Sequence, residues 1–250
     1  KVGIIYFSAP YDFGAIDMLD SFVPAYKIGS GDITWIEACL RMARKGKPVL
    51  LATGASTIGD VQRAVDAILP VNPQLVLMQC NTNYTAADGN FDSIHLNVLK
   101  TYRQMWPNLI LGLSDHTHGH ATVLGAVALG ARVVEKHFTD DNHREGPDHA
   151  FAMNPTSWAE MVQATRQLER AMGSANKTIA ENEHDTVIVQ RRCLRAARDI
   201  KAGEIMTREM IDVLRPAAPG AIMPYDINQV VGLTASQDIS SGQELRWTQL

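Results

Sequence analysis

Residues 109–138, LILGLSDHTHGHATVLGAVALGARVVEKHF, decide the fold that this sequence predicts. An apolar run at 109–113 ends in the polar group Ser-Asp-His, a stretch of small residues follows, and a second apolar run at 131–134 ends in Glu-Lys-His. Strand, helix and strand in this order are typical of a βαβ unit with parallel strands. Each strand therefore carries polar residues at its carboxyl end, where α/β proteins place their chemistry.

His116 and His137 occupy matching positions at the ends of these two strands. Neighbouring parallel strands lie about 4.8 Å apart, so the two imidazoles can converge on one ion or one substrate. A single histidine at a strand end is more often held by ordinary hydrogen bonds. Two at matching positions, with a carboxylate near each, favour a metal site or an acid–base pair.

The composition excludes several classes of protein. The 250 residues are 46% hydrophobic, which is enough for a large core. A net charge of −4 with interspersed signs disfavours nucleic-acid binding, and we find no apolar run long enough to cross a membrane. The three cysteines (39, 80 and 193) follow no disulfide or metal-binding spacing, which suits a reducing cytoplasm.

Further strand–helix repeats surround the central unit and predict a parallel α/β fold. We expect strands at 2–7, 25–28, 49–52, 75–79, 109–113 and 131–134, with helices at 17–22, 37–45, 58–69, 94–106 and 158–172. The absence of a G-x-G-x-x-G turn disfavours a dinucleotide-binding sheet. An eight-stranded (β/α)8 TIM-type barrel typically needs about 250 residues. Residues 1–172 carry six repeats, so we expect a barrel domain that lacks its first two βα repeats.

The carboxyl-terminal part has a different character. Residues 173–186 are polar and predict a linker. In residues 187–250 short strands alternate with turns, and two segments, RDIKAGEIMT and QDISSGQELR, resemble each other. This pattern predicts a small, β-rich second domain.

Polar residues also follow the earlier strands. Lys27 and Ser30 lie in the sequence KIGSG, and Thr53 precedes a glycine at the next strand end. Each is an ordinary tight turn when taken alone, but a lysine, hydroxyls and exposed backbone N–H groups at adjacent strand ends favour phosphate or carboxylate binding. Asn83 and Tyr84 could bind a polyol, although surface loops are rich in such residues.

Two further residues have both an ordinary and a functional interpretation. Asp148, in a Gly-Pro-Asp-His turn, is either a turn former or a ligand for a sugar hydroxyl. Arg215 is an ordinary solvated arginine unless the second domain reaches an active site.

The sequences YKIGSGD, LLATGAS, LGLSDHT, LGAVALGARVVEKHFT, GPDHAFAMNP and VLRP resemble the sialic acid synthase (N-acetylneuraminate synthase) family. The likeness extends over essentially the whole chain, and the carboxyl-terminal part resembles that family's antifreeze-like (SAF) domain. It implies a (β/α)8 barrel with a small domain that is swapped across a homodimer. It also implies an enzyme that condenses phosphoenolpyruvate with an N-acetylated hexosamine-type aldehyde and releases phosphate.

The resemblance also implies roles for individual residues. The ligands of a divalent metal, Mn²⁺ or Mg²⁺, would be His116 and His137. Phosphoenolpyruvate would be held by Lys27, Ser30 and Ser114. The sugar pocket would be lined by Glu135, Tyr84 and Asp148. Of these, Glu135 and Asp148 are candidates for proton transfer, and Arg215 would extend towards the sugar site of the partner subunit.

Several alternatives stay open. The aldehyde could be a precursor of legionaminate or pseudaminate rather than of sialic acid. The same barrel could serve a metal-dependent aldolase or a sugar-phosphate synthase. In a different class, the chain could be an inactive barrel fragment that only binds a saccharide.

Overall fold

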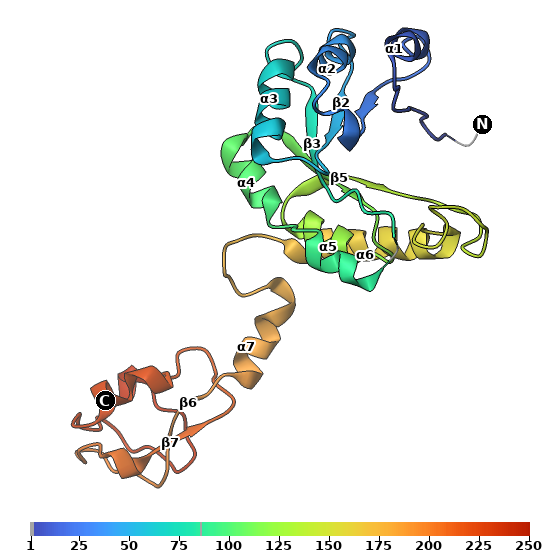
Figure 1. Ribbon diagram of the computed structural model, residues 1–250. Coiled ribbons are helices and arrows are strands. Elements are labelled where there is room, and N and C mark those ends of the chain that lie inside the picture. The colour runs from blue at the N-terminus through green and yellow to red at the C-terminus, as the bar shows by residue number, and fades with distance from the viewer. Residues whose placement is uncertain (1–2, 86) are drawn as a thin grey trace. The chain divides into compact units, whose positions relative to one another are not determined.

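A computed structural model describes residues 3–85 and 87–250, which form two compact units (Figure 1). The first unit ends at Gly173, and the second comprises Ser174–Leu250. Among the described residues, no helix combines the length and the apolar character needed to cross a membrane.

The first unit is built on a five-stranded parallel sheet. Its strands are β1 Tyr26–Ile28, β2 Val49–Ala52, β3 Leu75–Cys80, β4 Ile110–Asp115 and β5 Ala131–Lys136. They lie in the order of the sequence, and each adjacent pair is parallel. Each connection between consecutive strands is a crossover that leads to the next strand in the same direction across the sheet. Right-handed crossovers of this kind place all their helices on one face, so the helices lie along the outer face of the sheet (Figure 1). The predicted parallel α/β fold is confirmed.

Six α-helices in the described part of this unit accompany the sheet. They are α1 Phe13–Leu19, α2 Ile36–Ala43, α3 Ile58–Ile68, α4 Val98–Met105, α5 Ala121–Ala128 and α6 Pro155–Met172. Two of them begin with reciprocal caps, formed by Thr57 with Asp60 in α3 and by Asn154 with Ser157 in α6. These side chains satisfy backbone N–H groups that a first helical turn leaves unpaired, which explains why the helices start there.

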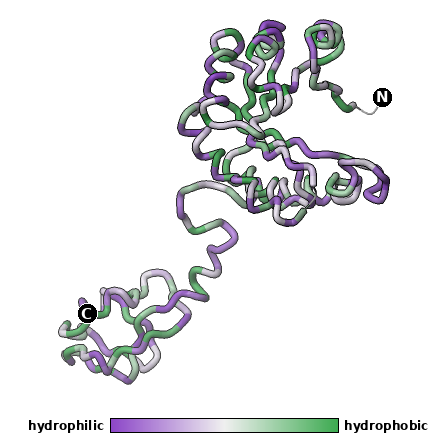
Figure 2. The backbone as a smooth tube through the Cα atoms, in the orientation of Figure 1, coloured by the Kyte–Doolittle hydropathy of each residue, from purple (hydrophilic) through white to green (hydrophobic). Residues whose placement is uncertain are grey.

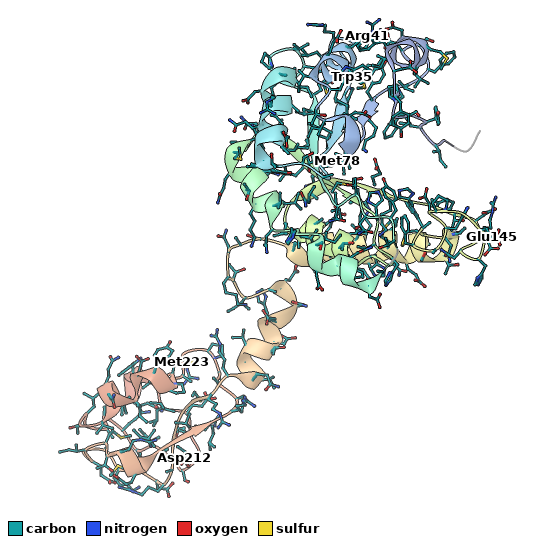
Figure 3. The ribbon with its side chains drawn as sticks, viewed as in Figure 1. Trp35, Arg41, Met78, Glu145, Asp212 and Met223 are labelled. Atoms are coloured by element: carbon teal, nitrogen blue, oxygen red, sulfur yellow. The ribbon has the colours of Figure 1, made fainter. Side chains whose placement is uncertain are left out.

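The two faces of the sheet differ because successive side chains of a strand point to opposite sides. One face packs against the helices through a continuous apolar core that includes Val49, Leu51, Leu75, Leu77, Leu111 and Leu113. The residues between them form a smaller apolar cluster of Leu50, Val76 and Met78. Figure 2 shows the hydrophobic strands, and Figure 3 labels Met78 near the centre of this unit. We call this second side of the sheet the inner face.

The strand predicted at 2–7 is wrong for residues 3–7, and Val2 lies outside the described residues. Ile4 and Ile5 are 83% and 72% exposed, and pairing begins only at Ser8, through an isolated parallel bridge to Tyr26. An apolar run becomes a strand when neighbouring elements cover its side chains. No described segment covers these residues.

Several helix predictions are wrong at their boundaries, and α6 begins at Pro155 rather than at 158. The first helix begins at Phe13 rather than at 17, because the Asp12 carboxylate accepts a hydrogen bond from the Ala15 backbone N–H at 2.7 Å and caps the turn. The helix predicted at 94–106 begins only at Val98. His95 has a φ of +49°, a left-handed conformation that a right-handed helix cannot include.

The second unit contains a two-stranded antiparallel sheet, β6 Cys193–Ala196 and β7 Ile211–Leu214, with helices α7 His184–Gln190 and α8 Ile227–Val230. The stretch predicted as a linker, 173–186, is therefore helical at its end. The two similar segments noted in the sequence pair with each other. Ile200 and Ile239 exchange backbone hydrogen bonds of 2.8 and 2.9 Å, and both belong to the apolar core of this unit.

An ion pair buried between β4 and β5 fixes the strand ends that carry the polar residues. Asp115 lies opposite Lys136 in the register, and their side chains are 0% and 1% exposed. The Lys136 Nζ donates hydrogen bonds of 2.6 Å to Asp115 Oδ2 and to the Thr117 carbonyl. The hydroxyl of Thr122 also donates to Asp115, at 2.7 Å. Both charges are thus fully engaged on the helix-packed face.

We predict that Lys136→Met lowers the free energy of unfolding by about 3–5 kcal/mol, because it leaves the Asp115 carboxylate buried without its cation. Urea denaturation followed by tryptophan fluorescence measures the change. The control is Arg144→Met, which removes an ion pair to Asp140 whose side chains are 56% and 74% exposed, and this variant should change stability by less than about 1 kcal/mol. Equal effects of the two substitutions would contradict the structural role of the buried pair.

Candidate active site

A cavity of about 580 Å³ lies at the carboxyl ends of the strands, and we call it the strand-end cavity. Predicted site residues that line it are Lys27, Ser30, Tyr84, Ser114, His116, Glu135 and His137. The alternation of side chains explains why they meet. Ser114 lies opposite Glu135 in the register of β4 and β5, and both continue the inner face that Met78 begins in β3.

Lys27, Glu135 and Ser114 form a polar group in the wall of this cavity. The Lys27 Nζ lies 3.2 Å from Glu135 Oε1, and its side chain is only 11% exposed. The Ser114 hydroxyl donates a 2.8 Å hydrogen bond to the same carboxylate oxygen. One carboxylate oxygen therefore holds both a nearly buried ammonium and a hydroxyl. These two donors suit an anionic group of a substrate.

Ser30 stands where the loops after three strands meet. Its hydroxyl oxygen accepts a 2.9 Å hydrogen bond from the Gly54 backbone N–H. A Cβ at position 54 would lie 2.9 Å from Ser30 Oγ and 2.7 Å from Thr82 Cγ2, so only glycine allows this approach. The glycine after Thr53 thus has a packing role that brings Ser30 and Thr82 together at the edge of the cavity.

The two histidines are oriented by their Nδ1 atoms. His116 Nδ1 lies 2.7 Å from the Asn81 carbonyl oxygen, and His137 Nδ1 lies 3.2 Å from Asp148 Oδ2. The ring centroids are 5.0 Å apart. An oxygen partner at Nδ1 leaves Nε2 as the ligand or acceptor atom of each neutral ring. Burial lowers the pKa of His116, which favours its uncharged form at neutral pH.

Aromatic rings enclose the histidine pair. The Tyr84 ring lies 4.2 Å from that of His116 and 5.7 Å from that of His137, measured between centroids. Phe151, which is 1% exposed, lies 5.1 Å from the His137 ring. Burial also raises the pKa of the Tyr84 phenol, so this group stays protonated as a hydrogen-bond donor.

The other predicted site residues lie outside the lining of this cavity. Thr53 is on the helix-packed face, where its hydroxyl donates to the Met78 carbonyl and accepts from Tyr102, both at 2.9 Å. Asn83 accepts hydrogen bonds from Thr85 within its own loop. Asp148 reaches the site only through His137. Arg215 belongs to the second unit and is exposed.

The structure also places residues in the cavity that the sequence did not indicate. Cys80 ends β3 opposite Ser114, and Tyr11, Asp32 and Thr82 line the wall from the segments that flank the strands. Cys80 could have been found from its position, because it continues the alternation of Val76 and Met78. Burial raises the pKa of its thiol, so it contributes an uncharged wall. Tyr11 carries no signal in the sequence, since it follows a segment that forms no strand.

Within the described ranges, no three His, Cys, Asp or Glu side chains are grouped in a way that could hold a metal ion. The side chains that come closest to forming such a group are the imidazoles of His116 and His137. A cation at this position would need oxygen atoms of substrate or water to complete its coordination.

Comparisons with known proteins agree with the resemblance seen in the sequence. Residues 1–177 match the NeuB family, and residues 191–250 match the SAF domain. The chain is 34% identical to the N,N'-diacetyllegionaminic acid synthase of Legionella pneumophila, covering 99% of this chain and 69% of that protein. It is 30% identical to the human N-acetylneuraminate-9-phosphate synthase, covering 98% of this chain and 68% of that one.

The chain spans about two thirds of the length of such relatives. An uncharacterised protein of Methanocaldococcus jannaschii is 39% identical over 86% of this chain and 64% of its own. Among solved structures, the spore coat polysaccharide biosynthesis protein SpsE of Bacillus subtilis is similar, with a TM-score of 0.63 and 29% identity over 98% of this chain and 73% of that one. The family resemblance is thereby confirmed: this chain belongs to the NeuB family.

Proposed function

We propose that this protein is a synthase that joins phosphoenolpyruvate to an N-acetylated hexosamine-type aldehyde through a new carbon–carbon bond and releases phosphate. The observation that carries the proposal is the nearly buried Lys27 ammonium in a cavity with two imidazoles. The ammonium suits an anionic substrate, and the pair of imidazoles suits a metal ion. The names of the relatives, which are synthases of sialic- and legionaminic-type acids, support the same chemistry.

Phosphoenolpyruvate would bind where cation and hydroxyl donors are grouped. Lys27 and Ser114 now share one oxygen of Glu135, and an incoming phosphate or carboxylate can accept from the same donors. Ser30 adds a hydroxyl at the meeting point of the loops. The ammonium and the two hydroxyls supply hydrogen-bond donors that an anionic substrate group can accept from in place of Glu135.

The histidine pair fits a divalent cation, Mn²⁺ or Mg²⁺, with His116 and His137 as its protein ligands. Both rings have an oxygen partner at Nδ1, which sets their orientation, and burial keeps His116 uncharged. When bound, such an ion would act as a Lewis acid that polarises the aldehyde oxygen. Asp148 is then a positioning residue for His137.

The proposed reaction balances without a redox partner. Carbon 3 of phosphoenolpyruvate attacks the aldehyde carbon, whose oxygen takes up a proton. Water adds to carbon 2 and loses a proton. The bond between carbon 2 and the phosphate oxygen then breaks, the new hydroxyl gives its proton to the departing inorganic phosphate, and carbon 2 becomes a ketone. Glu135, which lines the cavity, is the carboxylate that we propose for these proton transfers, whereas Asp148 would act through His137.

Three finer features belong to this proposal. The sequential parallel sheet suits an eight-stranded barrel. Exchange of the second unit between two copies would bring Arg215 to the sugar site of the partner subunit. The aldehyde is an N-acetylated hexosamine, and legionaminate or pseudaminate precursors are the competing acceptors.

We expect initial rates, measured with each aldehyde at saturating phosphoenolpyruvate, to identify the preferred acceptor.

Metal removal should abolish the reaction. We predict that EDTA stops phosphate release from phosphoenolpyruvate and N-acetylmannosamine, and that excess Mn²⁺ or Mg²⁺ restores it, because the aldehyde loses its Lewis acid. A coupled phosphate assay measures the rate, with inorganic phosphate added as a control for the coupling enzymes. Full activity of the chelated and dialysed protein would remove the metal from the proposal, and sugar binding without phosphate release would identify a binding protein.

We predict that His116→Ala lowers the rate of phosphate release by about a hundredfold or more while the protein stays folded, because it removes one of only two protein ligands. The matched control is His118→Ala. His118 lies two residues further along the same loop, is half exposed and contacts Asp88. It should keep the wild-type rate and Mn²⁺ affinity. Comparable rates for both variants would show that His116 has no role in turnover.

A further inference from the structure

In the second unit, two arginines and a glutamate form a partly buried cluster, Arg195, Glu244 and Arg246, which we call the arginine–glutamate cluster. Arg195 Nη2 lies 2.8 Å from Glu244 Oε1, and the two side chains are 18% and 16% exposed. Arg246 Nη2 lies 3.4 Å from the other oxygen, Oε2. The partners are 49 and 2 residues apart in sequence, so the cluster joins β6 to the segment near the carboxyl end.

The donors and acceptors of this cluster hold the loop at 215–220 at three successive points. Arg195 Nη2 donates a 2.8 Å hydrogen bond to the Pro216 carbonyl. The Ala218 backbone N–H donates to Glu244 Oε1 at 3.2 Å, and Arg246 Nη1 donates to the Pro219 carbonyl at 3.1 Å. This loop follows β7, on which Figure 3 labels Asp212. Its backbone is thus determined by side chains from two distant segments.

The arginine–glutamate cluster is better explained by its effect on the position of the loop at 215–220 than by a contribution to the free energy of folding. Arg195 Nη1 is also engaged, by the Gly242 carbonyl at 2.8 Å, but its Nε is buried without a partner, the one such side-chain atom among the described residues. A buried ion pair with an unsatisfied donor adds little to folding. What it does provide is a fixed position for every group that it contacts.

Arg215, at the start of this loop, is left free. It is exposed, and it forms no side-chain hydrogen bond or ion pair with the described residues, whereas Arg195 and Arg246 use their donors to hold the backbone after it. A guanidinium whose neighbouring peptide is fixed loses less conformational freedom when it binds an oxygen-rich ligand.

We propose that the arginine–glutamate cluster positions Arg215 for the sugar substrate by fixing the loop at 215–220. This inference rests on the proposed function, in which Arg215 contacts the N-acetylated hexosamine. Glu244 is the central positioning residue, because it accepts from both arginines and from the Ala218 N–H. It does not itself touch the substrate.

The test is Glu244→Gln in the full chain, compared with Glu204→Gln. Glu204 belongs to the same unit and pairs with Arg198 at 2.7 Å, but it does not contact the loop. We expect Glu244→Gln to raise the KM for N-acetylmannosamine by about tenfold, with kcat and the KM for phosphoenolpyruvate within about twofold of wild type. Hydrogen exchange at the Ala218 amide should accelerate by about tenfold. Glu204→Gln should change none of these.

A double variant separates positioning from a general effect on the unit. If Glu244 acts only through Arg215, then Arg215→Ala with Glu244→Gln should have the same sugar KM as Arg215→Ala alone. Additive effects on the sugar KM would overturn the inference, as would a wild-type KM in Glu244→Gln. If Glu244→Gln does not fold, as judged by circular dichroism, Arg246→Gln takes its place, because it releases only the Pro219 carbonyl and the distal oxygen of Glu244.

The proposed function can fail separately. If the wild-type protein releases no phosphate with any aldehyde acceptor, the synthase proposal fails and the role of the cluster in sugar affinity fails with it. Amide exchange then still decides whether Glu244 orders the loop. Unchanged exchange at Ala218 in Glu244→Gln would show that it does not.

Discussion

The register between β4 and β5 is the constraint on which the rest of the site depends. It sets Ser114 opposite Glu135 and Asp115 opposite Lys136. Because neighbouring side chains in a strand point to opposite faces, the first pair enters the strand-end cavity and the second is buried against the helices. A slip of β5 by one residue would turn Lys136 towards the cavity, away from Asp115, and would turn Glu135 towards the apolar core. The buried ion pair therefore fixes the positions of the strand ends and, in the same contact, determines which polar groups face the strand-end cavity.

The cavity combines groups that differ sharply in charge. Lys27 is a nearly buried cation whose carboxylate partner, Glu135, stands in the same wall. Just beyond the ends of β4 and β5, the rings of Tyr84 and Phe151 pack against the histidine pair. Electrostatic interactions are stronger where water is excluded, so an anion at Lys27 and a cation at the imidazoles would each be held more firmly than on an open surface. This division suits a reaction between an anionic enol phosphate and a neutral aldehyde.

Both units use buried or partly buried ionic contacts to fix the backbone near candidate functional residues. In the first unit, Lys136 holds Asp115 and the Thr117 carbonyl beside His116. In the second, Arg195 and Glu244 hold the loop that follows Arg215. Ion pairs of this kind add little net stability, since desolvation offsets the attraction between the charges. Their effect is to limit the conformations of the chain, which is what a site needs when its reactive groups come from loops.

The order of strands and helices, the polar residues at the strand ends and the family were all readable in the sequence, because hydrophobic periodicity and motif spacing are local properties of the chain. Tertiary packing decided the rest. It directed Thr53 to Tyr102 and away from the cavity, brought Tyr11 into the cavity wall, and left residues 3–7 exposed instead of forming a strand. A side chain's face and its partners depend on which distant elements pack against its strand, and that information lies in no single segment of the sequence.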